Sequence, residues 1–247
     1  MNNQEKITFI SKWISKYVEN MIIPAKSLIV GISGGIDSAL TSTLSCLTTM
    51  NTFVISMPIN KNSKTCDLSN VHGEWLTKNY PNANHITIDL SSVYKAFNSS
   101  LVNNNQTSDL GFANSKARLR MMTLYQVAAA QKGIVVGTGN KVEDFGVGFY
   151  TKYGDGGVDI SPIADLMKSE VKSLSETLKI DERIIDADPT DGLWDDGRTD
   201  EGQLGFKYSE LEDAMGNPNS PHREQYEKIR NQNLHKMEPI PVCKIPS

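Results

Sequence analysis

The chain has 247 residues, with 25 Lys or Arg against 29 Asp or Glu, which gives a formal charge of -4. This balance provides no global attraction to nucleic acid or to an anionic membrane, so an anionic ligand must be held by local groups. Its three cysteines are too widely spaced for a disulfide framework or a zinc site. No apolar run approaches the roughly 20 residues that span a bilayer. We therefore expect a cytoplasmic protein with no membrane or nucleic-acid partner.

Apolar periodicity predicts the elements in chain order. Spacings of three and four indicate a first helix that ends near Pro24. Four short apolar runs then predict strands at 27–32, 52–57, 85–90 and 133–138. Helical patterns separate these runs, and the longest helix is expected at 114–132. The fold class that follows is α/β, a doubly wound and mostly parallel sheet with helices on both faces. We expect a single domain over residues 1–247.

Three segments do not fit this alternation. Residues 98–110 are polar and are interpreted as a connection. The glycine-rich and acidic segments 152–162 and 186–205 are interpreted as long loops, which in compact domains often bind ligands or close over them. About residues 239–247, a proline-rich tail is expected, because proline cannot continue a helix.

The segment GISGGIDS, residues 31–38, joins a predicted strand to a predicted helix. Its glycines let backbone N–H groups approach an anion, and the helix N-terminus adds partial positive charge. It matches neither the Walker A pattern nor GxGxxG. Hydroxyl groups suit phosphate oxygens, whereas Asp37 beside phosphates requires a bridging cation. The alternative is a tight turn in which Asp37 and Ser38 only cap the next helix.

In the order Ser-Gly-Gly-x-Asp-Ser, this segment resembles the loop of PP-loop ATP pyrophosphatases, which cleave ATP between its α and β phosphates. Two longer blocks, at 114–128 and 135–171, resemble the NAD synthetase family in order and spacing, as do late Pro-Thr and His-Lys pairs. The resemblance covers most of residues 5–236. It implies an adenine nucleotide alpha hydrolase-like fold.

The resemblance also implies roles for individual residues. ATP is assigned to Gly31, Ile32, Ser33, Gly34, Gly35, Ile36, Asp37, Ser38, Thr138, Lys168 and Thr190. Magnesium is assigned to Asp37 and Glu143. Deamido-NAD is assigned to Arg118, Lys152, Asp159, His235 and Lys236.

Elementary geometry supports part of this assignment. Asp37 and Glu143 both follow predicted strands, and the carboxyl ends of parallel strands share one edge of a sheet, so the two carboxylates are expected to meet. Arg118 and Arg120 lie two residues apart on a helix and therefore on nearly opposite faces. We assign Arg118 to the ligand and interpret Arg120 as a structural charge. His72 and His85 are interpreted as structural or surface residues.

The activity implied is ATP-dependent amidation of deamido-NAD, with Lys168 stabilising the pyrophosphate. Asp155 is our hypothesis for the group that takes a proton from ammonium. Free ammonia is the expected nitrogen donor unless a separate subunit delivers it, since there is no room for an amidase domain before residue 31. A homodimer is also implied. Two alternatives stay open: another PP-loop enzyme, either tRNA-modifying or GMP synthetase-like, and a non-catalytic nucleotide-binding module.

Overall fold

The computed structural model describes residues 1–59, 64–190, 192–194 and 196–245. Its sheet has four parallel strands in the order β3-β2-β1-β4. The strands are β1 (Ser27–Ile32), β2 (Asn51–Ser56), β3 (Ala83–Thr87) and β4 (Gly133–Val135). All four predicted strands are therefore confirmed, with ends shifted by a few residues at most.

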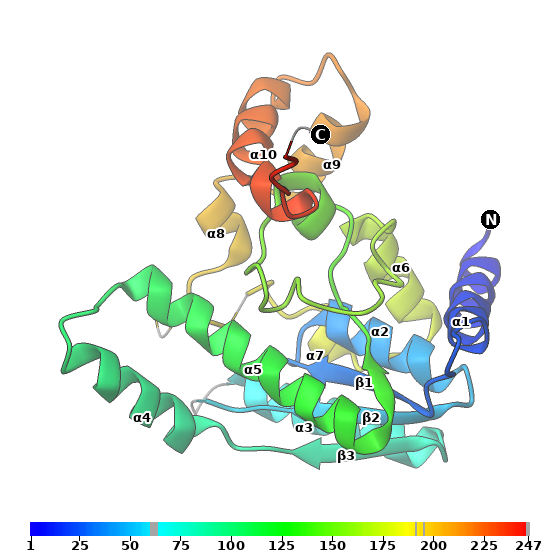
Figure 1. Cartoon of the computed structure of the whole chain (residues 1–247). Helices are drawn as coiled ribbons and strands as arrows, with labels where there is room; N and C mark the ends of the chain where they lie inside the picture. The colour runs from blue at the N-terminus through cyan, green and yellow to red at the C-terminus, as the bar shows by residue number, and fades with distance from the viewer. Residues whose placement is uncertain (60–63, 191, 195, 246–247) are drawn as a thin grey trace.

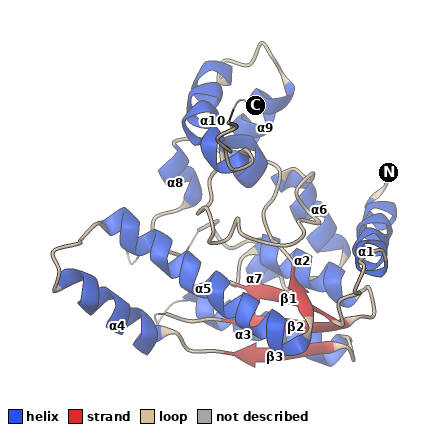
Figure 2. Cartoon of the chain, viewed as in Figure 1, coloured by secondary structure: helices blue, strands red, loops and turns tan. Residues whose placement is uncertain are grey.

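Helices cover both faces of this sheet (Figure 2). One face carries α2 (Ile36–Cys46) and α3 (Lys64–Asn79), with α1 (Asn3–Glu19), α6 (Lys168–Thr177) and α7 (Glu182–Ile185) packed behind them. The other face carries α5 (Asp109–Gln131), with α4 (Ser91–Val102) beside it. The α/β class with helices on both faces is confirmed. Within the described ranges, no helix is both long and apolar enough to cross a membrane.

Alternation along β1 divides the core into two layers. Leu28, Val30 and Ile32 pack towards α1, α2 and α6, whereas Ile29 packs towards α5. Gly31 also faces α5, where a Cβ would lie 3.2 Å from the Leu124 side chain. An added Cβ would therefore require the Leu124 and Met57 side chains to shift by a few tenths of an ångström.

The interpretation of residues 98–110 as a connection is wrong for most of the segment. Helix α4 continues to Val102, and α5 begins at Asp109 after a cap in which the Ser108 side chain accepts a hydrogen bond from the Gly111 N–H. No residue of α4 is buried. Asn98, Ser99 and Ser100, residue types that are common in loops, occupy the second half of this helix, and they explain why its end was interpreted as a connection.

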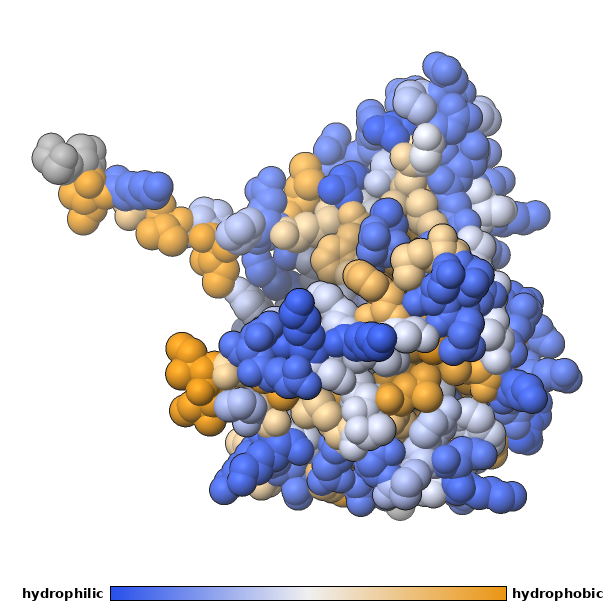
Figure 3. Space-filling view, turned by 90° about the vertical axis from the view of Figure 1, so that its right-hand side faces the viewer, coloured by the Kyte–Doolittle hydropathy of each residue, from blue (hydrophilic) through white to orange (hydrophobic). Residues whose placement is uncertain are grey.

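A second helical layer lies at the C-terminal end of the sheet. It consists of the π-helical turn η1 (Glu143–Val147), α8 (Asp200–Leu204), α9 (Tyr208–Gly216) and α10 (Arg223–Met237), drawn at the top of Figure 1. These elements share a hydrophobic cluster of their own. The loop predicted at 186–205 thus ends in one short helix. After Met237 no helix continues through residue 245, as predicted, and Figure 3 shows this tail extending from the body of the molecule.

Candidate functional site

The sheet has a switch in strand order between β1 and β4. From β1 the chain adds β2 and β3 on one side, then returns to place β4 on the other. In open α/β sheets, ligands bind at such a point, outside the carboxyl ends of the strands. A cavity of about 910 Å³ lies there and is lined by all of residues 31–38.

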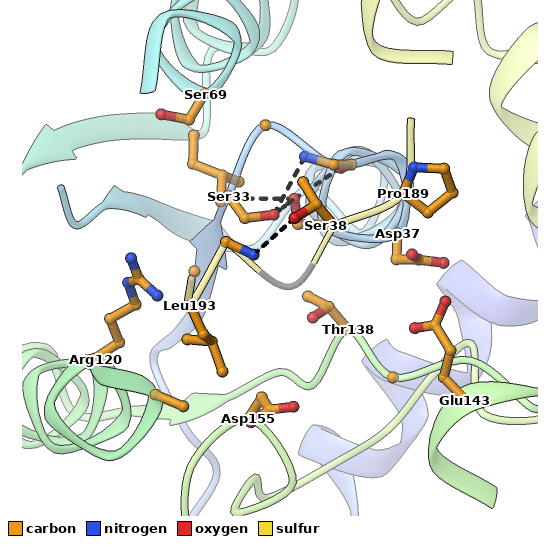
Figure 4. Close-up of a pocket in the computed structure, with 18 of the residues that line it drawn as sticks. Ser33, Asp37, Ser38, Ser69, Arg120, Thr138, Glu143, Asp155, Pro189 and Leu193 are labelled. Carbon is orange, nitrogen blue, oxygen red and sulfur yellow. Dashed lines mark hydrogen bonds between the residues drawn. The ribbon is translucent and has the colours of Figure 1, made fainter. Parts of the chain in front are cut away.

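The 31–38 loop is held by its own serines. Ser38 Oγ accepts a hydrogen bond from the Ser33 N–H at 3.1 Å and donates to the Gly35 carbonyl at 2.9 Å. Ser33 Oγ lies 3.2 Å from Ser38 Oγ and accepts from the Gly35 N–H (Figure 4). Gly34 has a φ of 90°, which favours glycine. The hydroxyl and amide groups that suit phosphate oxygens are thus gathered at the start of α2.

Asp37 does not cap the helix, so that part of the alternative interpretation is wrong. Its carboxylate instead points towards Glu143 (Figure 4). Lys168 Nζ bridges the two, at 2.6 Å from Asp37 Oδ2 and 2.8 Å from Glu143 Oε1. The three side chains are 12% to 18% exposed. Residues from β1–α2, from the segment after β4 and from α6 therefore form one buried charged cluster, and the expected meeting of the two carboxylates is confirmed.

The pKa values of the two carboxylates in the cluster are shifted in opposite directions. Burial raises the pKa of Asp37, and the charge of Glu143 raises it further. Burial acts in the same direction on Glu143, but the Lys168 ammonium and a hydrogen bond from Tyr208 outweigh it and lower the pKa of Glu143. Burial alone would lower the pKa of Lys168, yet the two carboxylates raise it. One ammonium group balances two acids, which leaves negative charge for a cation to neutralise.

Asn140 links the two sides of this cluster. Its Nδ2 donates to Asp37 Oδ1 at 3.1 Å, and its Oδ1 accepts from the N–H groups of Val142 and Glu143, both at 3.0 Å. Asn140 is fully buried. Asn140 follows β4 at the edge of the sheet where ligands bind. No sequence motif assigned a role to this residue.

The remaining residues assigned to ATP also line the cavity, namely Thr138, Lys168 and Thr190. Thr190 Oγ1 donates to the Arg198 carbonyl at 3.2 Å, which ties the loop after α7 to itself. Asp155 lines the cavity too, and its Oδ1 accepts from the Thr151 N–H at 3.0 Å. The structure therefore brings together every residue assigned to ATP, to magnesium or to catalysis.

None of the five residues assigned to the dinucleotide lines this cavity. Four of them meet beside it, along the 150–153 segment. Arg118 Nε donates to the Lys152 carbonyl at 3.2 Å, and Lys152 Nζ donates to the His235 carbonyl at 3.0 Å. Lys236 Nζ donates to the Tyr150 carbonyl at 2.9 Å. The long helix α5 and the last helix α10 are thus joined through one glycine-rich loop.

Asp159, the fifth of these residues, supports the backbone. Its Oδ2 accepts from the Val135 N–H at 2.7 Å, and its Oδ1 accepts from the Tyr125 hydroxyl at 3.0 Å. Burial and the nearby Asp159 carboxylate raise the pKa of Tyr125 to about 12. Asp159 therefore holds the end of β4 against α5.

Arg120 is the arginine of the pair that lines the cavity (Figure 4). Its Nε also donates to the Met57 carbonyl at 3.3 Å, so it braces the end of β2. Arg118 and Arg120 lie on different faces of α5, as their spacing predicts. The spacing alone does not determine which of the two faces meets the cavity.

The histidines have structural partners. His72 is buried, with its Nε2 3.0 Å from Ser42 Oγ and its ring stacked on Trp75. His85 Nε2 lies 2.9 Å from Ser56 Oγ. No group of three or more His, Cys, Asp or Glu side chains able to hold a metal occurs among the described residues. A magnesium ion at Asp37 and Glu143 would therefore need oxygen atoms from a ligand to complete its shell.

Comparison with known proteins agrees with this geometry. A family model described as NAD synthase matches residues 6–245. The NH(3)-dependent NAD(+) synthetase of Mycoplasmopsis pulmonis is 42% identical over 210 residues, 83% of this chain and 76% of that protein. The corresponding enzyme of Alkaliphilus oremlandii is 35% identical over 258 residues, covering 99% and 98% of the two chains.

Among solved structures, NMN synthetase from Francisella tularensis has a TM-score of 0.90 at 32% identity, covering 99% of this chain and all of that one. NH3-dependent NAD synthetase from Campylobacter jejuni has a TM-score of 0.79 at 24% identity, covering 99% and 100% of the two chains. The likeness to the Campylobacter jejuni structure supports the adenine nucleotide alpha hydrolase-like fold.

Proposed function

This chain belongs to the NAD synthase family, and from that premise we propose that it is a carbon–nitrogen ligase that uses ATP and ammonia to amidate a nicotinate nucleotide. The substrate is deamido-NAD, and the products are NAD, AMP and pyrophosphate. The observation that carries the proposal is the buried cluster of Asp37, Glu143 and Lys168 beside the Ser-Gly-Gly loop. A nucleotide-binding module without catalysis would have little use for Glu143 and Lys168 beside Asp37, and it would release no pyrophosphate.

Two bonds are exchanged in the reaction. A carboxylate oxygen of the nicotinate attacks the α-phosphorus of ATP, the bond between the α and β phosphates breaks, and pyrophosphate leaves. Ammonia then attacks the acyl carbon, AMP leaves, and the nitrogen gives up a proton. Adenylation is required because a carboxylate carries no leaving group that ammonia could displace.

The residues of the chain have separate tasks in this scheme. The loop hydroxyls of Ser33 and Ser38, with the backbone N–H groups at the start of α2, hold the departing pyrophosphate. The Lys168 ammonium stabilises the charge that grows on it, and preorganised charge of this kind is usually the largest catalytic contribution. Asp155 accepts the proton from the attacking nitrogen.

Asp37 and Glu143 fit a magnesium ion. They supply two carboxylates and the ligand would supply phosphate oxygens, which is the usual way Mg²⁺ is shared between a protein and a nucleotide. When bound, the ion neutralises charge on the phosphates. Because Lys168 now bridges the same carboxylates, metal binding would replace one of its contacts and direct the ammonium to the phosphates.

The nicotinate nucleotide extends from the cavity towards the 150–153 segment in this proposal. The positive side chains of Arg118, Lys152 and Lys236 suit the phosphates of a dinucleotide. Each now donates to a backbone carbonyl, so ligand phosphates would compete with those carbonyls. Asp159 contributes by fixing the strand on which the segment rests.

A homodimer is part of the proposal. Helices α4 and α5 lie together at one side of the molecule (Figure 1), and they expose six large apolar side chains. These are Val93, Phe97, Val102, Leu110, Met122 and Tyr125. Sedimentation of the wild type and of Phe97→Asp tests this: we expect a dimer that the substitution weakens, and a monomeric wild type would contradict it.

A second candidate substrate is the mononucleotide. It is favoured by the TM-score of 0.90 to NMN synthetase from Francisella tularensis, against 0.79 for the Campylobacter jejuni enzyme. The reacting carboxylate is the same in both substrates, so the cavity itself does not distinguish them.

One experiment tests the function and selects the substrate. The purified chain is incubated with ATP, Mg²⁺ and either deamido-NAD or nicotinate mononucleotide, with ammonium or glutamine as nitrogen source. We expect AMP and the amidated nucleotide only with ammonium, and more from the dinucleotide. A higher kcat/KM with the mononucleotide would favour the second candidate, and release of ADP instead of AMP would reject both.

A further inference from the structure

The buried cluster receives one side chain from the C-terminal helical layer, and no motif of the sequence analysis includes it. Tyr208 is the first residue of α9, and its side chain is buried. Its hydroxyl lies 2.5 Å from Glu143 Oε1, across 65 residues of sequence. Lys168 Nζ lies 4.8 Å from the centre of the Tyr208 ring. One side chain therefore contacts two members of the cluster in two ways.

The direction of the hydrogen bond to Glu143 is determined by chemistry. The Tyr208 hydroxyl donates, because a carboxylate offers only acceptor oxygens. A neutral donor orients a carboxylate without cancelling its charge. Lys168, in contrast, both orients Glu143 and neutralises it. Tyr208 therefore orients Glu143 without placing a second positive charge beside an arriving divalent cation.

Tyr208 is itself anchored to the segment that borders the nucleotide cavity. Its N–H donates to Glu201 Oε1 at 2.9 Å, and its hydroxyl lies 3.4 Å from Asp200 Oδ2. The N–H of Asp200 donates to the Pro189 carbonyl at 3.0 Å, and both Asp200 and Pro189 line the cavity. Hydrogen bonds and one 3.4 Å contact between Tyr208 and Asp200 thus connect the cavity wall at Pro189 to Glu143.

We propose that Tyr208 is a positioning residue for the nucleotide-bound divalent cation: its hydroxyl holds Glu143 in place while its ring supports the Lys168 ammonium. The inference rests on the proposed function, because it concerns the same cation. It assigns to the C-terminal layer a role in building the metal site, in addition to packing.

The test compares Tyr208→Phe with a matched control, Tyr226→Phe. Tyr208→Phe keeps the ring, its packing and its contact with Lys168, and it removes only the hydroxyl. Tyr226 is buried in the same hydrophobic cluster, and among the described residues its hydroxyl has one weak contact, 3.5 Å to the Gly146 carbonyl. The full-length chain is titrated with Mn²⁺ in the presence of α,β-methylene-ATP, which cannot be cleaved, and free Mn²⁺ is followed by electron paramagnetic resonance.

For Tyr208→Phe we expect the half-saturating Mn²⁺ concentration to rise about tenfold or more, since a hydrogen bond to a charged group is lost. The control should bind as wild type does. In turnover, excess Mg²⁺ should restore kcat/KM for ATP in Tyr208→Phe, a rescue that a merely structural defect would not show.

Two outcomes are adverse and differ in meaning. If wild type binds Mn²⁺ with the nucleotide and Tyr208→Phe binds it equally well, or the control is weakened as much, the role of Tyr208 is wrong and the proposed function is untouched. If wild type itself binds neither Mn²⁺ nor the nucleotide, the proposed function and this inference both fail.

Discussion

Asn140 Nδ2 lies 3.1 Å from Asp37 Oδ1, so a residue that follows β4 holds the carboxylate that follows β1. Its Oδ1 accepts hydrogen bonds from the N–H groups of Val142 and Glu143. One buried side chain therefore sets the separation between the two acids of the proposed metal site. Its position explains how two motifs about a hundred residues apart act together.

Replacing Asn140 separates these tasks. Asn140→Asp keeps an acceptor for the two N–H groups but loses the donor to Asp37, so we expect kcat/KM for ATP to fall about 100-fold, as small misplacements can cause. Asn140→Ala should in addition lower the free energy of unfolding by about 1–3 kcal/mol, because buried donors lose their acceptor. Steady-state kinetics and urea unfolding measure the two effects. Asn84→Ala, on the exposed end of β3, is the control. An active Asn140→Asp enzyme would contradict this role.

Removing the Lys168 ammonium should expose the charge imbalance. Lys168→Met leaves Asp37 and Glu143 buried without a counter-charge, and we expect the metal-free protein to lose about 3 kcal/mol of stability. The pKa of Asp37 is already raised, and loss of the ammonium raises it further. Protonation then relieves the repulsion, so the loss should be larger at a pH above the raised pKa of Asp37 than at a pH below it.

Mg²⁺ alone should raise the melting temperature of Lys168→Met more than that of wild type, because the ion takes the place of the ammonium. Activity should be lost. Lys141→Met, which removes an ion pair to the exposed Asp165, is the matched control and should behave as wild type. Equal stabilisation of variant and wild type by Mg²⁺ would argue against competition for one site.

Asp155→Asn tests the proton acceptor. An asparagine oxygen can still accept from the Thr151 N–H, so the loop is retained. In a single turnover we expect pyrophosphate release near the wild-type rate and slow formation of the amide product. Asp165→Asn, at an exposed carboxylate, is the control. Equal loss of both steps would reject the assignment of Asp155.

The two arginines of α5 should have separable effects. Arg120 lines the cavity, and Arg118 contacts the 150–153 segment. We expect Arg118→Leu to raise KM for the nicotinate nucleotide and leave KM for ATP unchanged. Arg120→Leu should do the reverse. Initial-rate kinetics with each substrate varied in turn provide the measurement, and an exchange of the two effects would show that the ligands are placed the wrong way round.

His72 should make folding stability depend on pH. Burial lowers its pKa to about 4, from 6.5 in an unfolded chain. Between these values the unfolded state binds more protons, so stability is full above pH 6.5 and falls as the pH drops. From pH 7.5 to 5.5 we expect a loss of about 1.3 kcal/mol from this residue. His72→Gln should flatten the profile measured by urea unfolding. A variant that keeps the full slope would assign the effect to other groups, such as His85, whose pKa burial also lowers.

Local pattern was sufficient for much of this structure. The strand β1 was predicted at its observed ends, because a buried apolar run passes directly into a glycine-rich loop. The meeting of Asp37 and Glu143 followed from a general property of parallel sheets, since both residues come after strands. The assignment of Thr138, Lys168 and Thr190 to the same cavity came from the family resemblance, which preserves such contacts without stating their geometry.

Contacts between distant segments were not predictable in this way. Tyr208 reaches Glu143 from a helix whose own periodicity describes only packing in its layer. The end of helix α4 was missed because Asn98, Ser99 and Ser100 are residue types common in loops. For Arg120, periodicity predicted on which face of α5 the side chain lies, but not that this face lines the cavity. The failures at Tyr208 and Arg120 concern tertiary contacts, which local sequence patterns do not encode.

The central claim is that the carboxylate of the nicotinate nucleotide is adenylated before ammonia attacks it. The most direct measurement uses substrate labelled with ¹⁸O in that carboxylate, incubated with the wild-type chain, ATP, Mg²⁺ and ammonium, followed by mass spectrometry of the AMP. Adenylation predicts AMP that carries one ¹⁸O atom for each amide formed. Unlabelled AMP, or formation of ADP and phosphate, would contradict the account.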